Sequence, residues 1–84
     1  MAYAMGSPEI RAVSRVIRSG HLFRYGSPGT GWQGQVEAFE EMFARFVGTK
    51  YAVATTSGTA SLMTALSAIG VGLGDEVIVP GYTF

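Results

Sequence analysis

The first part of the chain carries a hydrophobic stripe at helical spacing. Apolar residues recur every three or four positions at Ile10, Val13 and Ile17, which predicts an amphipathic helix. Ser7 supplies an N-cap hydroxyl and Pro8 suits the first helical position, so the helix is expected to begin there. Ser19-Gly20 is expected to end it, because glycine readily adopts the left-handed conformation at a helix C-terminus.

A second stripe of the same period predicts a second amphipathic helix, which ends at Gly48-Thr49. Its apolar positions are Val36, Phe39, Phe43 and Phe46. Acidic residues lie toward its beginning and Arg45 lies near its end, which is the distribution that the helix dipole favours. Glu41 and Arg45 are also spaced to form an ion pair worth about 0.2–0.5 kcal/mol.

The remaining chain predicts a strand, a helix and a second strand. Residues 51–54 and 77–79 are short apolar runs, as in a parallel sheet that helices cover on both faces. A third helix is expected from about Gly58 to Ile69, with the hydroxyls of Ser61, Thr64 and Ser67 bonded back into it. This order predicts one βαβ unit with a right-handed crossover, and hence an α/β fold.

Composition indicates that other protein covers much of this chain. The 84 residues are 48% hydrophobic and only 14% charged, which is the composition of a core with too few charges to coat a free surface. A single domain of this length buries only about 60–65% of its extended surface, so its stability is marginal.

Charge and residue usage exclude several classes of function. Six basic residues balance six acidic ones, so no field attracts nucleic acid or an anionic membrane. The arginine cluster at Arg11, Arg15 and Arg18 is interpreted as an exposed helix face. The absence of cysteine excludes thiolate chemistry, and the single histidine, His21, cannot form a histidine metal cluster. No signal peptide or membrane-length apolar run is evident, so a cytoplasmic protein is expected.

Residues 20–34 form a glycine-rich loop that also carries aromatic and basic side chains. These side chains are His21, Phe23, Arg24, Tyr25 and Trp32. Long loops of this kind are often functional. The alternative is a surface loop whose aromatic residues pack on a neighbouring domain or subunit, and the sequence leaves both interpretations open.

The turn at residues 55–60, Thr-Thr-Ser-Gly-Thr-Ala, precedes the third predicted helix. The first N–H groups of a helix lack intrahelical partners and its dipole favours negative charge, so the turn can hold an anion. It lacks the Gly-Lys-Ser/Thr ending of a P-loop and the three-glycine dinucleotide pattern. Turns of this composition also serve simply as N-caps.

The second predicted strand is followed by Gly81, Tyr82, Thr83 and Phe84. Parallel strands present their C-terminal ends at one edge of the sheet, where open α/β sheets bind ligands. The turn can hold a phosphate at this edge, and an aromatic residue after the second strand can stack on a flat ring. A phosphate joined to a flat ring suggests pyridoxal phosphate.

An ordered set of segments resembles the DegT/DnrJ/StrS family of pyridoxal-phosphate-dependent sugar and cyclitol aminotransferases, which have fold type I. The segments are residues 39–40 (Phe-Glu), 43–54, 57–60 (Ser-Gly-Thr-Ala), 74–80 (Gly-Asp-Glu-Val-Ile-Val-Pro) and 83–84 (Thr-Phe), and residues 9–20 fit the family's first helix. The resemblance implies that residues 1–84 are an N-terminal portion of the large cofactor-binding domain. This incomplete portion would hold two helices and then a βαβ unit of a mainly parallel sheet.

The resemblance also implies roles for individual residues. Thr59 and Ala60 match the family's phosphate-binding turn, in which backbone N–H groups and the threonine hydroxyl hold the cofactor phosphate. Gly58 lets the backbone approach closely. Phe84 matches the aromatic residue that stacks on the pyridine ring, and Ser57 matches a small polar position with a supporting role.

Two catalytic groups of the family lie beyond residue 84, namely the lysine that forms the Schiff base and the acid that keeps the pyridine nitrogen protonated. No catalytic residue is therefore assigned within this chain. Lys50, which precedes the first predicted strand, is not expected to reach the ring. Residues 1–84 alone are expected to be inactive.

The activity implied by the resemblance is transfer of an amino group from glutamate or glutamine to a ketone of a nucleotide-linked sugar or a cyclitol. A homodimer with active sites at the subunit interface is also implied. Two alternatives remain, a family member that uses the cofactor for dehydration and a non-catalytic binding or regulatory homologue. The residue at the lysine position would distinguish all three.

Overall fold

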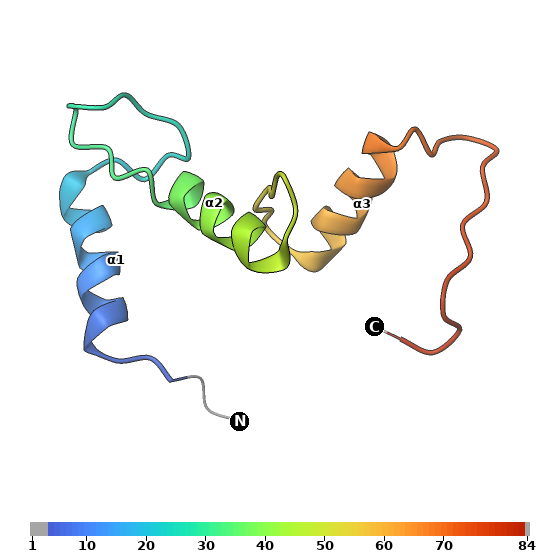
Figure 1. Ribbon diagram of the computed structural model, residues 1–84, viewed down its shortest axis with the longest axis horizontal. Helices are drawn as coiled ribbons and strands as arrows, with labels where there is room; N and C mark the ends of the chain where they lie inside the picture. The colour runs from blue at the N-terminus through green and yellow to red at the C-terminus, as the bar shows by residue number, and fades with distance from the viewer. Residues whose placement is uncertain (1–3, 84) are drawn as a thin grey trace. The chain divides into compact units, whose positions relative to one another are not determined.

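A computed structural model describes residues 4–83, and within them it contains three α-helices (Figure 1). The helices are α1 (Ser7–Ser19), α2 (Gln35–Val47) and α3 (Gly58–Ala68). The chain divides into two units, of which Met1–Val53 contains α1 and α2 and Ala54–Phe84 contains α3. No helix in the described part is long and apolar enough to cross a bilayer.

Helix α1 begins slightly earlier than the sequence predicts. Gly6 is the N-cap, so Ser7 is already helical and Pro8 lies in the first turn. The Gly6 N–H donates to Glu9 Oε2 at 2.7 Å, which is one half of a capping box. This bond lowers the pKa of Glu9 below its ordinary value, because it stabilises the carboxylate. The predicted end is confirmed, since Gly20 adopts φ 71°.

Helix α2 confirms the second predicted helix and its end at Gly48, which has φ 84°. Phe39 and Phe43, four residues apart on the apolar stripe, stack with ring centroids 5.6 Å apart. The expected pair between Glu41 and Arg45 is present at 3.5 Å, but both side chains are exposed. A pair of this kind contributes about 0.2–1 kcal/mol.

Helix α3 confirms the third predicted helix. Ser57 is its N-cap, with Oγ accepting the Ala60 N–H at 3.0 Å. Thr64 Oγ1 donates to the Ala60 carbonyl at 2.7 Å and Ser61 Oγ donates to the Ser57 carbonyl at 3.1 Å, as expected for hydroxyls bonded back into a helix. The helix is followed by Gly70 at φ 83°.

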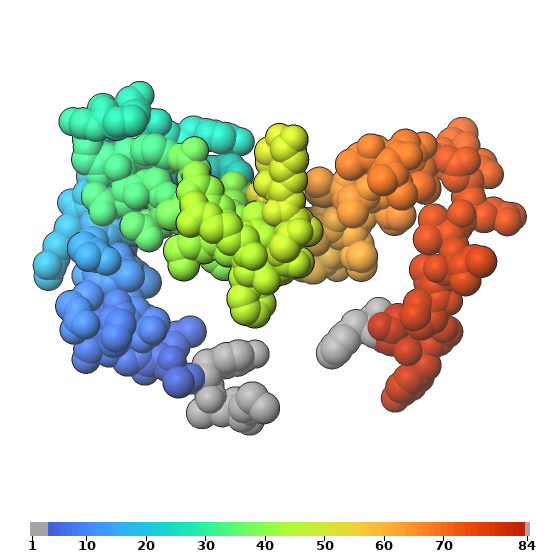
Figure 2. All heavy atoms as spheres, in the orientation of Figure 1, coloured from blue at the N-terminus to red at the C-terminus, as the bar shows by residue number. Residues whose placement is uncertain are grey.

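The two predicted strands are not formed. Residues 51–54 and 77–79 have no regular secondary structure, and no strand occurs anywhere in residues 4–83. The prediction of a βαβ unit is therefore wrong for this structure. A strand requires a second strand to pair with, which parallel sheets draw from distant sequence, and residues 4–83 contain no strand that could pair with either segment. Ile78 is 101% exposed, and Figure 2 shows this tail of the second unit as a strip one chain wide.

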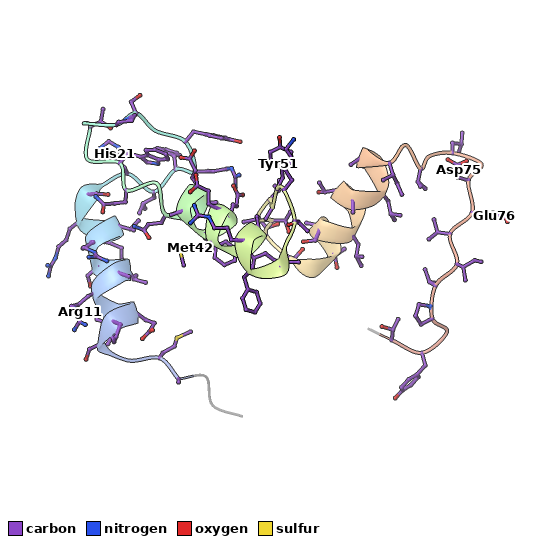
Figure 3. All side chains as sticks on the ribbon, viewed as in Figure 1. Arg11, His21, Met42, Tyr51, Asp75 and Glu76 are labelled. Carbon is purple, nitrogen blue, oxygen red and sulfur yellow. The ribbon has the colours of Figure 1, made fainter. Side chains whose placement is uncertain are left out.

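Few apolar side chains are buried. Within the described part, Ala44 is the only buried hydrophobic residue, at 6% exposed, whereas Phe46 is 87% exposed. In the first unit α1 and α2 do not pack on each other. Figure 3 shows their side chains projecting from the ribbon, with Arg11 on α1 and Met42 on α2 labelled. The apolar stripes of both helices exist as predicted, and in residues 4–83 they lie largely exposed.

Candidate functional site

The candidate anion site is the start of α3. The N–H of Ala60 is taken by the Ser57 hydroxyl. The N–H groups of Gly58 and Thr59, at the first two helical positions, have no hydrogen-bond partner within residues 4–83. Both residues are exposed, so these N–H groups are free to donate to an anion.

A network of hydroxyl groups holds the turn in place. Thr55 Oγ1 donates to the Ser57 carbonyl at 3.0 Å and lies beside Ser61 Oγ, which donates to the same carbonyl. The Thr59 hydroxyl is not part of this network and has no hydrogen-bond partner in the described chain. The turn therefore offers a third donor, beside the two N–H groups, on a backbone that its neighbours fix.

The space in front of the turn is open. A Cβ added at Gly58 would meet no atom within 4 Å. The turn itself contains no acidic residue, so a phosphate placed there would meet neutral donors and no carboxylate. The donor set therefore fits a phosphate group, which helix N-termini bind through N–H groups of this kind.

Not every predicted site residue can be placed. Gly58, Thr59 and Ala60 lie together at the start of α3, but Phe84 lies outside the described residues. The sheet edge that was expected to bring residues 80–84 to the turn is not formed. Lys50 Nζ lies 5.3 Å from the centroid of the Tyr51 ring.

The loop at residues 20–34 forms a concave feature in the first unit. A hollow of about 410 Å³ is lined by Arg24, Tyr25, Gly26, Pro28, Trp32, Glu37 and Glu40. Arg24 Nη2 lies 2.5 Å from Glu40 Oε1, and this hydrogen bond raises the pKa of Arg24 above its ordinary value. The Arg24 guanidinium also lies 5.5 Å from the centroid of the Tyr25 ring. The sequence singled out the loop, but it carried no signal that would pair its arginine with α2.

Comparison with known proteins identifies the family. The model of the DegT/DnrJ/EryC1/StrS aminotransferase family matches residues 4–84. The chain belongs to this family. This confirms the resemblance carried by the segments between residues 39 and 84, and it covers the described turn at the start of α3.

Several curated aminotransferases are similar to this chain. It is 46% identical over 81 residues to an L-glutamine:2-deoxy-scyllo-inosose aminotransferase of Streptomyces lividus, covering 96% of this chain and 18% of that protein. It is 47% identical over 73 residues to the protein of the same name in Micromonospora echinospora, covering 87% of this chain and 17% of that protein.

A third relative has a different name. The spore coat polysaccharide biosynthesis protein SpsC of Bacillus subtilis is 46% identical over 80 residues, covering 95% of this chain and 18% of that protein. The chain thus spans about 18% of the length of the curated relatives that it matches. No solved structure matches the chain significantly.

Proposed function

We propose that the complete protein is a pyridoxal-phosphate-dependent aminotransferase. It would move an amino group from glutamate or glutamine to the ketone of a nucleotide-linked sugar or a cyclitol. The observation that carries this proposal is the family match over residues 4–84. It is supported by relatives whose names specify L-glutamine as donor and 2-deoxy-scyllo-inosose as acceptor.

The start of α3 is the proposed phosphate site. The N–H groups of Gly58 and Thr59 and the hydroxyl of Thr59 would hold the phosphate, because these donors are exposed and unpaired in the described chain. Ala60 would join them when its N–H, now held by Ser57 Oγ at 3.0 Å, turns to the phosphate. Charge-assisted hydrogen bonds to a phosphate are stronger than the neutral bond they would replace.

When bound, pyridoxal phosphate supplies the electron sink and carries the amino group. We propose that Phe84 stacks on its ring and excludes water from one face, which is the role implied for this position by the family. The protein is also proposed to be a homodimer with its active sites at the subunit interface.

The test uses the complete protein. We expect a visible absorbance band from bound cofactor, and conversion of glutamine to its keto acid only when a keto-sugar or keto-cyclitol is present. Loss of the keto substrate without conversion of the amino donor would indicate the dehydratase instead. Absence of both the absorbance band and any turnover would indicate a non-catalytic homologue.

A further inference from the structure

The loop at residues 20–34 has an anchor of its own. We infer that the Arg24–Glu40 ion pair is a clip that fixes this loop on α2 and keeps the hollow beside it formed before any ligand arrives. This inference concerns the first unit alone and does not depend on the proposed function.

The pair joins parts of the chain that would otherwise move independently. Arg24 and Glu40 are 16 residues apart, and Nη2 and Oε1 lie 2.5 Å apart. Their side chains are only 33% and 13% exposed, so water screens this pair less than a surface pair. The loop contains five glycines, so holding it in one conformation costs more entropy than for an ordinary loop, and an anchoring contact is needed to offset that cost.

A second contact joins two parts of the loop to each other, so the Arg24–Glu40 pair anchors a loop that already has internal structure. Trp32 Nε1 donates to the Phe23 carbonyl at 3.3 Å. The Trp32 side chain lies directly against Gly26, where an added Cβ would overlap its Cγ. Tyr25, Gly26 and Trp32 also line the hollow. Fixing Arg24 therefore fixes the residues that give the hollow its wall.

The chain contains a matched pair for comparison. Glu41 is the next residue of α2 and pairs with Arg45 at 3.5 Å, but the two side chains are 63% and 78% exposed. Both residues of this pair lie on α2, so it connects nothing beyond the helix. The variants Glu40→Gln and Glu41→Gln make the same chemical change at adjacent residues, and only the first should release the loop.

The experiment measures hydrogen–deuterium exchange in the complete protein, on peptides that cover residues 20–34. For Glu40→Gln we expect loop amides to exchange about 5–150-fold faster, the range for losing a hydrogen bond between charged groups. Glu41→Gln should change them by less than about twofold. Equal exchange in the two variants would overturn the inference.

A double-mutant cycle separates the clip from general damage to the fold. If the pair acts as one unit, Arg24→Met combined with Glu40→Gln should exchange no faster than the faster single variant. Additive increases in the double variant would show that the two residues act separately, and would refute the clip. Exchange in α2 peptides beyond residue 41 should stay unchanged in all variants.

Discussion

The Thr59 hydroxyl provides the sharpest test of the phosphate site. In the complete protein, Thr59→Val removes a hydroxyl that makes no hydrogen bond within residues 4–83. The residue is exposed, so the change should alter the free energy of unfolding by no more than about 0.5 kcal/mol. A loss of cofactor affinity would then come from the lost contact with the phosphate, and not from a less stable fold.

The expected loss is the value of one hydrogen bond to a charged group. That value is about 1–3 kcal/mol, which corresponds to about 5- to 150-fold weaker retention of pyridoxal phosphate. Thr59→Ser should be milder, because the hydroxyl survives. The assay is titration of the cofactor-free protein with pyridoxal phosphate, followed by visible absorbance, beside a thermal melt of each variant.

Thr64→Val is the matched control, since it makes the same change on the same helix. The Thr64 hydroxyl donates to the Ala60 carbonyl at 2.7 Å and so faces the helix backbone. Its loss should leave cofactor affinity unchanged. If Thr59→Val binds pyridoxal phosphate as tightly as the parent protein, the Thr59 hydroxyl is not part of the site.

Four further predictions follow from other parts of the chain. In the complete protein, Gly26→Ala should displace Trp32 and destabilise the loop by about 1–3 kcal/mol, seen as faster hydrogen exchange. Gly72→Ala, with no atom within 4 Å of the added Cβ, should leave the loop unchanged. Residues 1–84 expressed alone should associate or be partly unfolded, because their apolar stripes are exposed; a monomeric, cooperative melt would contradict this. The lowered pKa of Glu9 means that its carboxylate stabilises α1 above about pH 4.3 and that this contribution disappears as pH falls through the folded-state pKa. Glu9→Gln should abolish that pH dependence of exchange at the start of α1. Phe84→Ala should weaken cofactor binding by about 0.5–1.5 kcal/mol beyond the lost contact area, whereas Phe84→Trp should retain it. A Trp variant that melts early with normal cofactor binding would assign Phe84 to a core.

The helices could be predicted because their signals are local. Apolar spacing set the faces of α1 and α2, and Gly20 and Gly48 ended these helices as expected. The start of α1 was misplaced by one residue because the cap is formed by a backbone N–H and the Glu9 carboxylate. No N-cap hydroxyl is involved, so the Ser7 signal pointed to the wrong residue.

The strands could not be confirmed because a sheet depends on partners that are distant in the sequence. An apolar run such as residues 77–79 states that a segment is suited to a buried sheet, but the sheet itself requires partners from elsewhere. The described chain brings none, and Val79 is 68% exposed. The apolar runs are therefore suited to strands of a buried sheet, but residues 4–83 alone do not form these strands.

The Arg24–Glu40 pair was missed because an ion pair across 16 residues has no sequence period to reveal it. The loop and α2 had to be folded together before the two side chains could be matched. In the sequence, Arg24 lies in a loop for which two interpretations were left open. Glu40 is one of the acidic residues that the helix dipole favours toward the N-terminus of the second helix.

The two features that this chain completes by itself are therefore the start of α3 and the loop clipped to α2. Each is held by contacts within its own unit, the hydroxyl network around Ser57 in one case and the Arg24–Glu40 pair in the other. Binding sites need donors fixed within a fraction of an ångström, because ordering them at the moment of binding costs affinity. These contacts order the turn and the loop although no sheet is formed in residues 4–83. The proposed phosphate turn is already capped by Ser57, and the loop is already joined to α2, so neither segment has to be ordered when a ligand binds.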